Sequence, residues 1–504
     1  MNNSLISQLK SGSDIRGIAL EGVEGEDINL TNEVIEKICC AFVRWISEKN
    51  EISFSDLSIS VGHDCRLSSF RIKNVLINTL RSVGVTVYDC SLSSTPAMYK
   101  SISLLSCTAA IQITASHHPF NRNGFKFFTA EGGVSSSDIT EILKLAENEP
   151  ILQSKKLGSV RQIDLMSYYT NGLCEIVKKE LKSRDDTPPL KGLKIVVDAG
   201  NGVGGFFAKE VLKPLGANIK GSIFLDPDGN FPNHIPNPEN TEAMNCISKA
   251  VVESSADLGI IFDTDVDRVA FVDSDGQKIS KNKFIALSSY IALKNNPGGV
   301  IVTDSMTSDY LKLFIEKCKG FSFRYKRGYN NVISLAKKID NEGSNCLLAI
   351  ESSGHAAFKE NNFLDDGAFL AVKVIIELVE RKKRGENLQS IIKDLIDAKE
   401  SINLRIPFSG TDYDIQNLLS DLKNYANSNK LFELDKENIE GVRIRFNSKH
   451  QKGWALVRKS IHDPVIVLYV ESYITGGAKA ILDSIQPFFK KYKFLNISEI
   501  DKNI

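Results

Sequence analysis

Leu258–Phe262 reads LGIIF and runs without a break into Asp263–Arg268, which reads DTDVDR. A short run without polar side chains predicts a buried strand, and the acidic loop then starts where that strand ends. Amphipathic stretches such as Val34–Ile46 and Ser69–Val83 alternate with further short apolar runs, at 57–61, 85–88, 109–113, 194–197, 300–303 and 347–350. Alternating strands and helices predict an α/β protein with mixed, mainly parallel sheets.

Three breaks divide the chain. Ser183–Lys191 is polar and contains paired prolines, Asn295–Gly299 reads NNPGG, and a third break lies near Lys399–Pro407. Beyond the third break the pattern changes to a helix, close-spaced strands and a final helix, with the strands at 441–446, 454–458 and 465–470. Length alone suggests about three domains. The breaks favour three similar α/β domains and a C-terminal α+β domain, over 1–185, 190–297, 298–402 and 403–504.

Composition excludes several classes of protein. The 62 basic and 62 acidic residues cancel, so the net charge gives no reason to expect nucleic-acid or membrane binding. An anionic substrate would need a local cluster of Arg and Lys. The nine cysteines show no disulfide framework and no zinc-site spacing, which fits a reducing compartment. With no secretory signal and no apolar run of about 20 residues, we expect a cytoplasmic protein.

The acidic loop is a candidate metal site. Asp263, Asp265 and Asp267 directly follow a strand, and three adjacent carboxylates are costly unless a cation neutralises them. Oxygen ligands select Mg²⁺ or Ca²⁺. The alternatives are a solvated turn or an EF-hand, but Arg268 and Ser274 stand where an EF-hand needs glycine and glutamate. Arg268 could instead contact phosphate oxygens.

Three more loops carry reactive side chains. Thr114–Pro119 reads TASHHP and offers Ser116 as a nucleophile, although a polar turn with an incidental serine is equally compatible. Glu351–His355 reads ESSGH and could bind vicinal sugar hydroxyls, or be a helix-capping turn. Arg458–Pro464 reads RKSIHDP, a turn that could hold a phosphate dianion. A further loop, Val61–Arg66, reads VGHDCR, and with it five of the seven histidines lie in candidate loops, at positions 63, 117, 118, 355 and 462.

Taken together, these loops resemble those of the α-D-phosphohexomutase family, which includes phosphoglucomutases, phosphomannomutases and phosphoglucosamine mutases. TASHHP is similar to the family's phosphoserine loop, DTDVDR to its metal loop, ESSGH to its sugar loop and RKSIHDP to its phosphate loop. Supporting matches are SGSDIRG at 11–17, VGHDCRLSS at 61–69, STP at 94–96 and VDAGNGVG at 197–204. The resemblance runs essentially end to end.

The resemblance implies an isomerase with four domains around one cleft. Ser116 would carry a phosphoryl group and, with Asp263, Asp265 and Asp267, hold Mg²⁺; a sugar bisphosphate such as glucose 1,6-bisphosphate would be the intermediate and activator. The other implied roles are charge stabilisation by Arg16, Lys126 and Arg268, proton transfer by Lys126 or His355, sugar binding by Glu351 and Ser353, and phosphate binding by Arg458, Ser460 and His462.

Departures from the family pattern affect substrate recognition. Ile350 stands where glycine is common, the loop near Arg327–Tyr329 lacks a frequent polar side chain, and Ile461–Asp463 differs from the usual phosphate loop. We therefore expect interconversion of hexose 1- and 6-phosphates, glucose or mannose first and glucosamine next. A sugar-phosphate phosphatase and a non-catalytic sensor are the alternatives, and the expected assembly is a monomer or homodimer.

Overall fold

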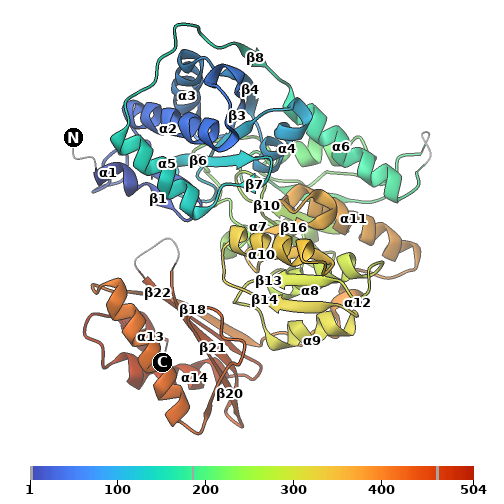
Figure 1. Ribbon diagram of the computed structural model, residues 1–504. Coiled ribbons are helices and arrows are strands. Elements are labelled where there is room, and N and C mark those ends of the chain that lie inside the picture. The colour runs from blue at the N-terminus through green and yellow to red at the C-terminus, as the bar shows by residue number, and fades with distance from the viewer. Residues whose placement is uncertain (1–3, 184–186, 461–464, 504) are drawn as a thin grey trace. The chain divides into compact units, whose positions relative to one another are not determined.

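The computed structural model describes residues 4–183, 187–460 and 465–503, and it divides into two compact units. Unit 1 comprises Met1–Ala292 and Ser353–Ile391, and unit 2 comprises Leu293–Ser352 and Ile392–Ile504. Figure 1 labels helices and strands where there is room. The expected α/β fold with a further C-terminal sheet is confirmed. Within the described ranges, no helix combines the length and the apolar character needed to cross a bilayer.

The larger sheet of unit 1 has the order β1-β2-β6-β5-β3-β4-β8. Its strands β5, β3, β4 and β8 are parallel, whereas β2 and β6 run antiparallel to their neighbours. The bounds are β1 Lys10–Ser11, β2 Asp14–Ile18, β3 Ser58–His63, β4 Thr86–Leu92, β5 Ala109–Ile113, β6 Arg122–Thr129, β7 Gly132–Gly133 and β8 Val160–Gln162. Strand β5 therefore ends at the serine loop, and strand β6 runs antiparallel beside it.

Helices pack on this sheet through one apolar core. Phe42 of α2 stacks on Phe127 of β6 with 4.3 Å between the ring centroids. Burying such aromatic pairs is a main source of stability in a core of this kind. The helices are α1 Ser4–Ser7, α2 Asn32–Asn50, α3 Ser69–Val83, α4 Thr95–Leu105, α5 Ser136–Asn148 and α6 Leu165–Glu180. The expected helices at 34–46 and 69–83 are α2 and α3.

A second sheet of unit 1 has the order β12-β11-β10-β9. Strand β10 is parallel to β9 and antiparallel to β11, so the acidic loop is the connection of a β10–β11 hairpin. The bounds of its strands are β9 Ile195–Asp198, β10 Leu258–Phe262, β11 Val269–Asp273 and β12 Lys278–Ile279, and those of the helices in the same stretch of the chain are α7 Thr241–Ser254 and α8 Asn282–Leu293. The later segment of unit 1 contains β16 Ala356–Phe358, β17 Leu364–Asp365 and α11 Gly367–Lys383. All five residues of β10 are buried, as its apolar sequence predicts.

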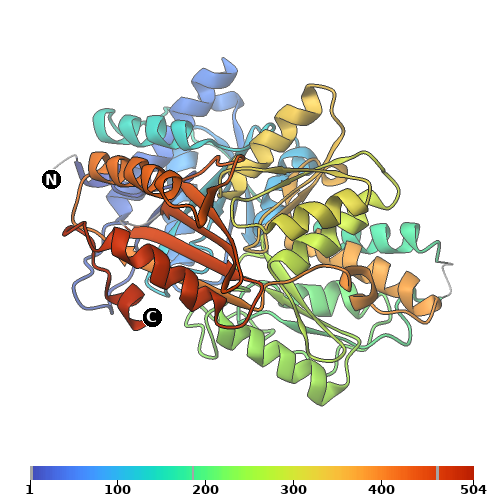
Figure 2. The same ribbon diagram turned by 90° about the horizontal axis from the view of Figure 1, so that it is seen from below.

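Unit 2 contains the parallel strands β14-β13-β15 and an antiparallel sheet of order β18-β22-β21-β20-β19. Figure 2 shows α13 and α14 over one face of the antiparallel sheet, where they share its core. The bounds are β13 Val300–Thr303, α9 Asp309–Lys317, β14 Phe321–Arg324, α10 Tyr329–Asn341, β15 Cys346–Ile350, β18 Glu400–Pro407, α13 Asp412–Ser428, β19 Phe432–Leu434, β20 Val442–Ser448, β21 Gln451–Lys459, β22 Val465–Ser472, α14 Gly477–Phe489 and α15 Ser498–Lys502.

The stretch interpreted as the third break is itself a strand. Strand β18, Glu400–Pro407, pairs antiparallel with β22 along its whole length. Leu404 and Ile406 are buried while Asn403 and Arg405 are exposed, which is the alternation of a strand with one face on the core. Its terminal proline suits an edge strand, where a missing backbone N–H costs little.

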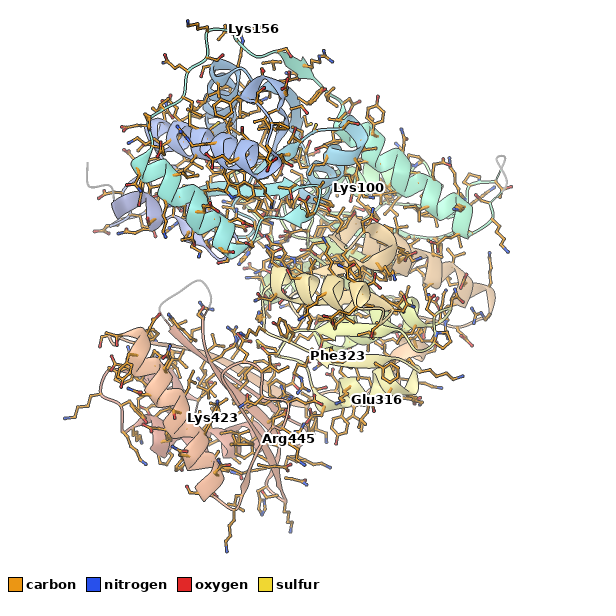
Figure 3. All side chains as sticks on the ribbon, viewed as in Figure 1. Lys100, Lys156, Glu316, Phe323, Lys423 and Arg445 are labelled. Atoms are coloured by element: carbon orange, nitrogen blue, oxygen red, sulfur yellow. The ribbon has the colours of Figure 1, made fainter. Side chains whose placement is uncertain are left out.

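Charged side chains join the two sheets of unit 2. Arg443 of β20 is 2% exposed, lies 3.5 Å from the ring centroid of Trp454, and donates to the carbonyls of Ser305 and Thr307 at 3.1 and 2.9 Å. Arg445, labelled in Figure 3, pairs with Asp309 at the start of α9 at 2.8 Å. Burial lowers the pKa of Arg443 to about 9, and the Arg324 cation adds to this effect. These contacts tie the β13–β15 sheet to the C-terminal sheet.

Candidate active site

The acidic loop brings three buried carboxylates together. Single oxygens of Asp263, Asp265 and Asp267 lie within 4.8 Å of one another. Val266 between them has φ +68°, a conformation that costs a β-branched residue energy and occurs mostly at functional sites. Gly202 allows close approach, because a Cβ there would lie 2.7 Å from the Thr264 carbonyl oxygen. The sequence thus builds a strained, tightly packed acidic loop.

The donor set fits a hard divalent cation. In the described part of the chain, Oδ1 of Asp265 and Oδ1 of Asp267 are buried without a hydrogen-bond partner. A buried carboxylate oxygen without a partner is costly, and a bound cation removes that cost. The three expected metal-binding carboxylates are therefore arranged as a cation site requires.

Lys126 partly offsets the acidic charge. Nζ of Lys126, on β6, lies 3.0 Å from Oδ2 of Asp265 and also contacts Asp267. Burial and the Asp267 charge raise the pKa of Asp263 well above its ordinary value. Burial acts in the same direction on Asp267, but the charges of Lys126, His355 and Arg268 together outweigh it and lower the Asp267 pKa. Lys126 thus belongs to the cluster that the sequence predicted.

Ser116 faces this cluster directly. Its Oγ donates to Oδ2 of Asp263 at 3.0 Å and accepts from Nη2 of Arg268 at 3.0 Å. Ser116 itself has φ +50°, and its backbone N–H donates to Oγ1 of Thr114 at 2.9 Å. The Arg66 guanidinium donates to the Ser116 carbonyl at 2.5 Å. The serine hydroxyl therefore lies between a carboxylate and a guanidinium, while Thr114 and Arg66 hold the backbone of its loop.

Arg16 and His117 complete the surroundings of Ser116. Nη2 of Arg16 lies 2.7 Å from Asp14, and Nη1 donates to the Thr114 carbonyl. Nδ1 of His117 accepts from Arg268 at 2.8 Å, because burial and the Arg268 cation hold the His117 pKa well below its ordinary value. His117 therefore acts as a neutral acceptor.

His355 belongs to the same cluster, with a partner that sequence reasoning missed. Nδ1 of His355 lies 2.5 Å from Oδ2 of Asp365, at the end of β17. Burial alone would lower the His355 pKa, but the charges of Asp365 and Asp267 outweigh it and raise the pKa to about 9. Gly354, one residue earlier, accepts a backbone hydrogen bond from Val269, at the start of β11. His355 is protonated at neutral pH.

Thr95 is a second missed residue. Its Oγ1 donates to Oδ2 of Asp265 at 2.5 Å, and its N–H donates to the Asp265 carbonyl at 2.9 Å. The STP motif was noted at this position, but 170 residues separate the two partners. Nothing local in the sequence pairs them.

Unit 2 holds a separate group of candidate residues. Oε1 of Glu351 accepts from the N–H of Gly328 at 2.6 Å. Glu440 accepts from the N–H of Arg327 at 3.1 Å and lies 3.8 Å from Nη1 of Arg458. Burial lowers the pKa of Arg458, and Glu440 counteracts it. The turn at Arg327 is therefore linked to both Glu351 and Arg458.

The remaining predicted residues divide between the units. Ser460 directly follows β21 in unit 2, and its N–H donates to the Val465 carbonyl at 2.9 Å. Ser353 is buried in unit 1, with His355, whereas Glu351 belongs to unit 2. His462, with Ile461, lies outside the described residues. The sugar loop thus crosses from one unit to the other between Ser352 and Ser353.

Known proteins are similar to this chain over most of its length. Models of α/β/α domains I, II and III of phosphoglucomutase/phosphomannomutase match residues 7–150, 168–276 and 280–398. The phosphomannomutase/phosphoglucomutase of Pseudomonas syringae pv. tomato is 32% identical over 88% of this chain and 89% of its own. A phosphoglucomutase of Neisseria gonorrhoeae is 28% identical, over 86% and 87%. The crystal structure of a phosphoglucomutase/phosphomannomutase family protein from Burkholderia thailandensis has a TM-score of 0.78 and 27% identity, over 96% and 97%.

Proposed function

Since the chain belongs to the phosphoglucomutase/phosphomannomutase family, we propose that Ser116 is its phosphoryl carrier. The chain is an isomerase that interconverts hexose 1-phosphates and hexose 6-phosphates. The observation that carries the assignment of Ser116 is the position of its Oγ, 3.0 Å from both Asp263 and Arg268. This hydroxyl lies beside the cation site and beside a donor for phosphate oxygens.

In the proposed reaction, a hydroxyl oxygen of the sugar phosphate attacks the phosphorus on Ser116. The new P–O bond forms as the bond to Oγ breaks, which gives a sugar bisphosphate. Lys126 or His355, in its neutral form, takes the proton from the attacking hydroxyl. In the return step the other phosphoryl group passes to Ser116, and the same group gives its proton back to the sugar oxygen. The protonated state of His355 suits this second step.

The charged side chains would act mainly through electrostatics and position. Arg268 donates to Oγ of Ser116 and is placed to donate to a phosphoryl oxygen there. Arg16 and Lys126 add positive charge to the same cluster. Asp263, Asp265, Asp267 and the phosphorylated Ser116 would hold Mg²⁺. When bound, the ion offsets negative charge on the transferring phosphoryl group.

Substrate binding is proposed for a second set of residues. Glu351 and Ser353 would bind sugar hydroxyls, and Arg458, Ser460 and His462 would bind the phosphate that is not transferred. We propose glucose or mannose phosphate as substrate, with glucosamine phosphate next, and glucose 1,6-bisphosphate as the activator that phosphorylates Ser116. The four domains 1–185, 190–297, 298–402 and 403–504 would carry the serine, metal, sugar and phosphate loops.

The setting of the enzyme is also a proposal. All nine cysteines are free, which supports a reducing compartment such as the cytoplasm. The net charge of zero supports small sugar phosphates as ligands, with no nucleic-acid or membrane partner. For the assembly, we propose a monomer or a homodimer.

Two rival functions make different demands. A phosphatase would release inorganic phosphate, and a sensor would need neither the serine nor the full acidic loop. The contact of Ser116 with Asp263 and Arg268 favours transfer chemistry over sensing.

A mutase assay tests the proposal. Purified protein is incubated with Mg²⁺, a trace of glucose 1,6-bisphosphate, and the 1-phosphate of glucose, mannose or glucosamine. We expect 6-phosphate from one of them without free phosphate, and loss of turnover in Ser116→Ala. Ser106→Ala is the matched control, because Ser106 has a similar φ of +52° but is exposed at the end of α4. Free phosphate as the main product would support the phosphatase, and full turnover by Ser116→Ala would refute the role of Ser116.

A further inference from the structure

Arg268 has an incomplete anchor on the acidic loop. Its Nε and Nη2 both donate to the same oxygen, Oδ2 of Asp263, at 3.0 and 2.9 Å. Nη2 also donates to Nδ1 of His117 at 2.8 Å, so Nη1 is the guanidinium nitrogen for which the acidic loop and the serine loop supply no acceptor among the described contacts, and an acceptor there would fix the plane of the group. The orientation of this plane matters because Nη2 is also the nitrogen that faces Oγ of Ser116.

Asn237 supplies the acceptor for Nη1. Its Oδ1 lies 3.3 Å from Nη1 of Arg268, the nitrogen that makes no contact with Asp263. Asn237 precedes α7 in the stretch 231–240, where no regular helix or strand is present. The guanidinium therefore donates to the acidic loop through Nε and Nη2, and to this stretch through Nη1.

Local hydrogen bonds fix Asn237 itself. Its Oδ1 also accepts the N–H of Glu239 at 2.9 Å, and its own N–H donates to the Ile235 carbonyl at 2.8 Å. Its carbonyl accepts the N–H of Asn240, which caps α7. The side chain thus has little freedom to leave Arg268.

A buried pair holds the same turn from the other side. Nδ1 of His234 lies 3.0 Å from the Ile235 carbonyl, so that oxygen accepts from both His234 and Asn237. Nε2 of His234 lies 2.9 Å from Oδ2 of Asp198, at the end of β9, and both side chains are fully buried. Gly200 leaves room for the turn, since a Cβ there would lie 2.8 Å from that of Pro236. The contact between His234 and Asp198 thereby attaches the turn to the second sheet of unit 1.

We propose that Asn237 is a positioning residue for Arg268, fixing the guanidinium so that Nη2 faces the phosphoryl group on Ser116. The inference rests on the proposed function of Ser116. It assigns Asn237 to the rate of phosphoryl transfer and not to sugar binding, because Asn237 contacts Arg268 and its own turn.

Three substitutions separate the two roles of Asn237. Asn237→Asp keeps an oxygen for both Arg268 and the Glu239 N–H. Asn237→Ser keeps a short acceptor for the N–H two residues on but does not reach Arg268. Asn218→Ser is the matched control, because Oδ1 of Asn218 accepts the Lys220 N–H at 3.0 Å in an exposed turn of the same sheet region.

The readouts are kcat and KM for the hexose 1-phosphate that the wild type turns over, with Tm measured in parallel. We expect Asn237→Ser to lower kcat about tenfold with KM changed less than about twofold, the usual size for a lost hydrogen bond to a charged group. Asn237→Asp should keep kcat within about threefold, and Asn218→Ser should match the wild type. Wild-type kcat in Asn237→Ser, or a loss of kcat explained by a lower Tm and shared by Asn237→Asp, overturns the proposal.

A second readout needs no sugar. Slow loss of phosphate from phosphorylated Ser116 into water is followed by intact mass, and Asn237→Ser should slow it relative to the wild type and to Asn218→Ser. Equal rates overturn the role of Asn237. A wild type that never carries phosphate on Ser116 overturns the proposed function instead, so the two failures are distinct.

Discussion

Replacing Asp365 by asparagine should lower the pKa of His355 by more than one unit. In the structure the His355 pKa is about 9, against an ordinary value of 6.5. The charge of the Asp365 carboxylate, 2.5 Å away, raises this pKa more than any other group does. A rise of this size corresponds to about 3 kcal/mol in favour of the protonated ring. Removing one adjacent charge typically shifts a pKa by about 1–3 units, so the pKa should approach its ordinary range.

NMR titration of the imidazole signals in metal-free, unphosphorylated protein measures this shift. The chain has seven histidines, and His355→Gln identifies the His355 signal by its loss. We expect an apparent pKa near 9 in the wild type and well below that in Asp365→Asn. A wild-type His355 signal that titrates near 6.5, or an unchanged value in the variant, would refute the reasoning.

Stability should follow with a defined sign. The folded pKa of His355 lies above its unfolded value, so the pair stabilises the fold fully below pH 6.5 and this contribution is lost as pH rises through about 9. The free energy of unfolding of the wild type should therefore fall across this window by up to about 3 kcal/mol relative to Asp365→Asn. His234, whose pKa is also raised, is present in both proteins and cancels in the comparison.

Three further outcomes are expected. Mg²⁺ should raise the Tm of the wild type but raise it much less in Asp265→Asn, because a ligand stabilises only the state that binds it; equal shifts would exclude the acidic loop as the site. Thr95→Val should lower kcat, with Thr95→Ser close to the wild type, because only the serine keeps the donor to Asp265; equal kcat in both variants would contradict this. Arg443→Ala should lower the free energy of unfolding by about 2–5 kcal/mol, measured by urea denaturation, because the carbonyls of Ser305 and Thr307 lose their buried donor; a loss below about 1 kcal/mol would contradict it.

Much of the fold can be predicted from the sequence because its signals are local. The run Leu258–Phe262 is apolar and short, and it is β10 with its expected bounds. Strand β18 escaped prediction because polar residues alternate with Ile402, Leu404 and Ile406 and a proline ends it, so the stretch has the composition of a linker. Pairing with β22 and packing on the core that buries Leu404 and Ile406 are long-range contacts that the local pattern does not contain.

The candidate site shows the same limit. Ser116, Lys126, Arg268 and His355 stand in motifs, and the structure places them in one cluster with the acidic loop. Asp365 was missed because it lies in a strand of ordinary composition, ten residues beyond its partner His355. Such residues act through contacts with side chains outside their own motif, and a single sequence gives no sign of those contacts.

The passage of the chain from unit 2 to unit 1 inside the sugar loop has a mechanical consequence. Glu351, the proposed sugar ligand, and His355, the proposed proton carrier, stand four positions apart on opposite sides of that crossing. Any rotation of one unit against the other would have to be absorbed by torsion angles between them, and Gly354, at φ +105°, is the residue with the widest choice of such angles. The three residues between Glu351 and His355 would thus limit how far the proposed sugar ligand and the proposed proton carrier can separate.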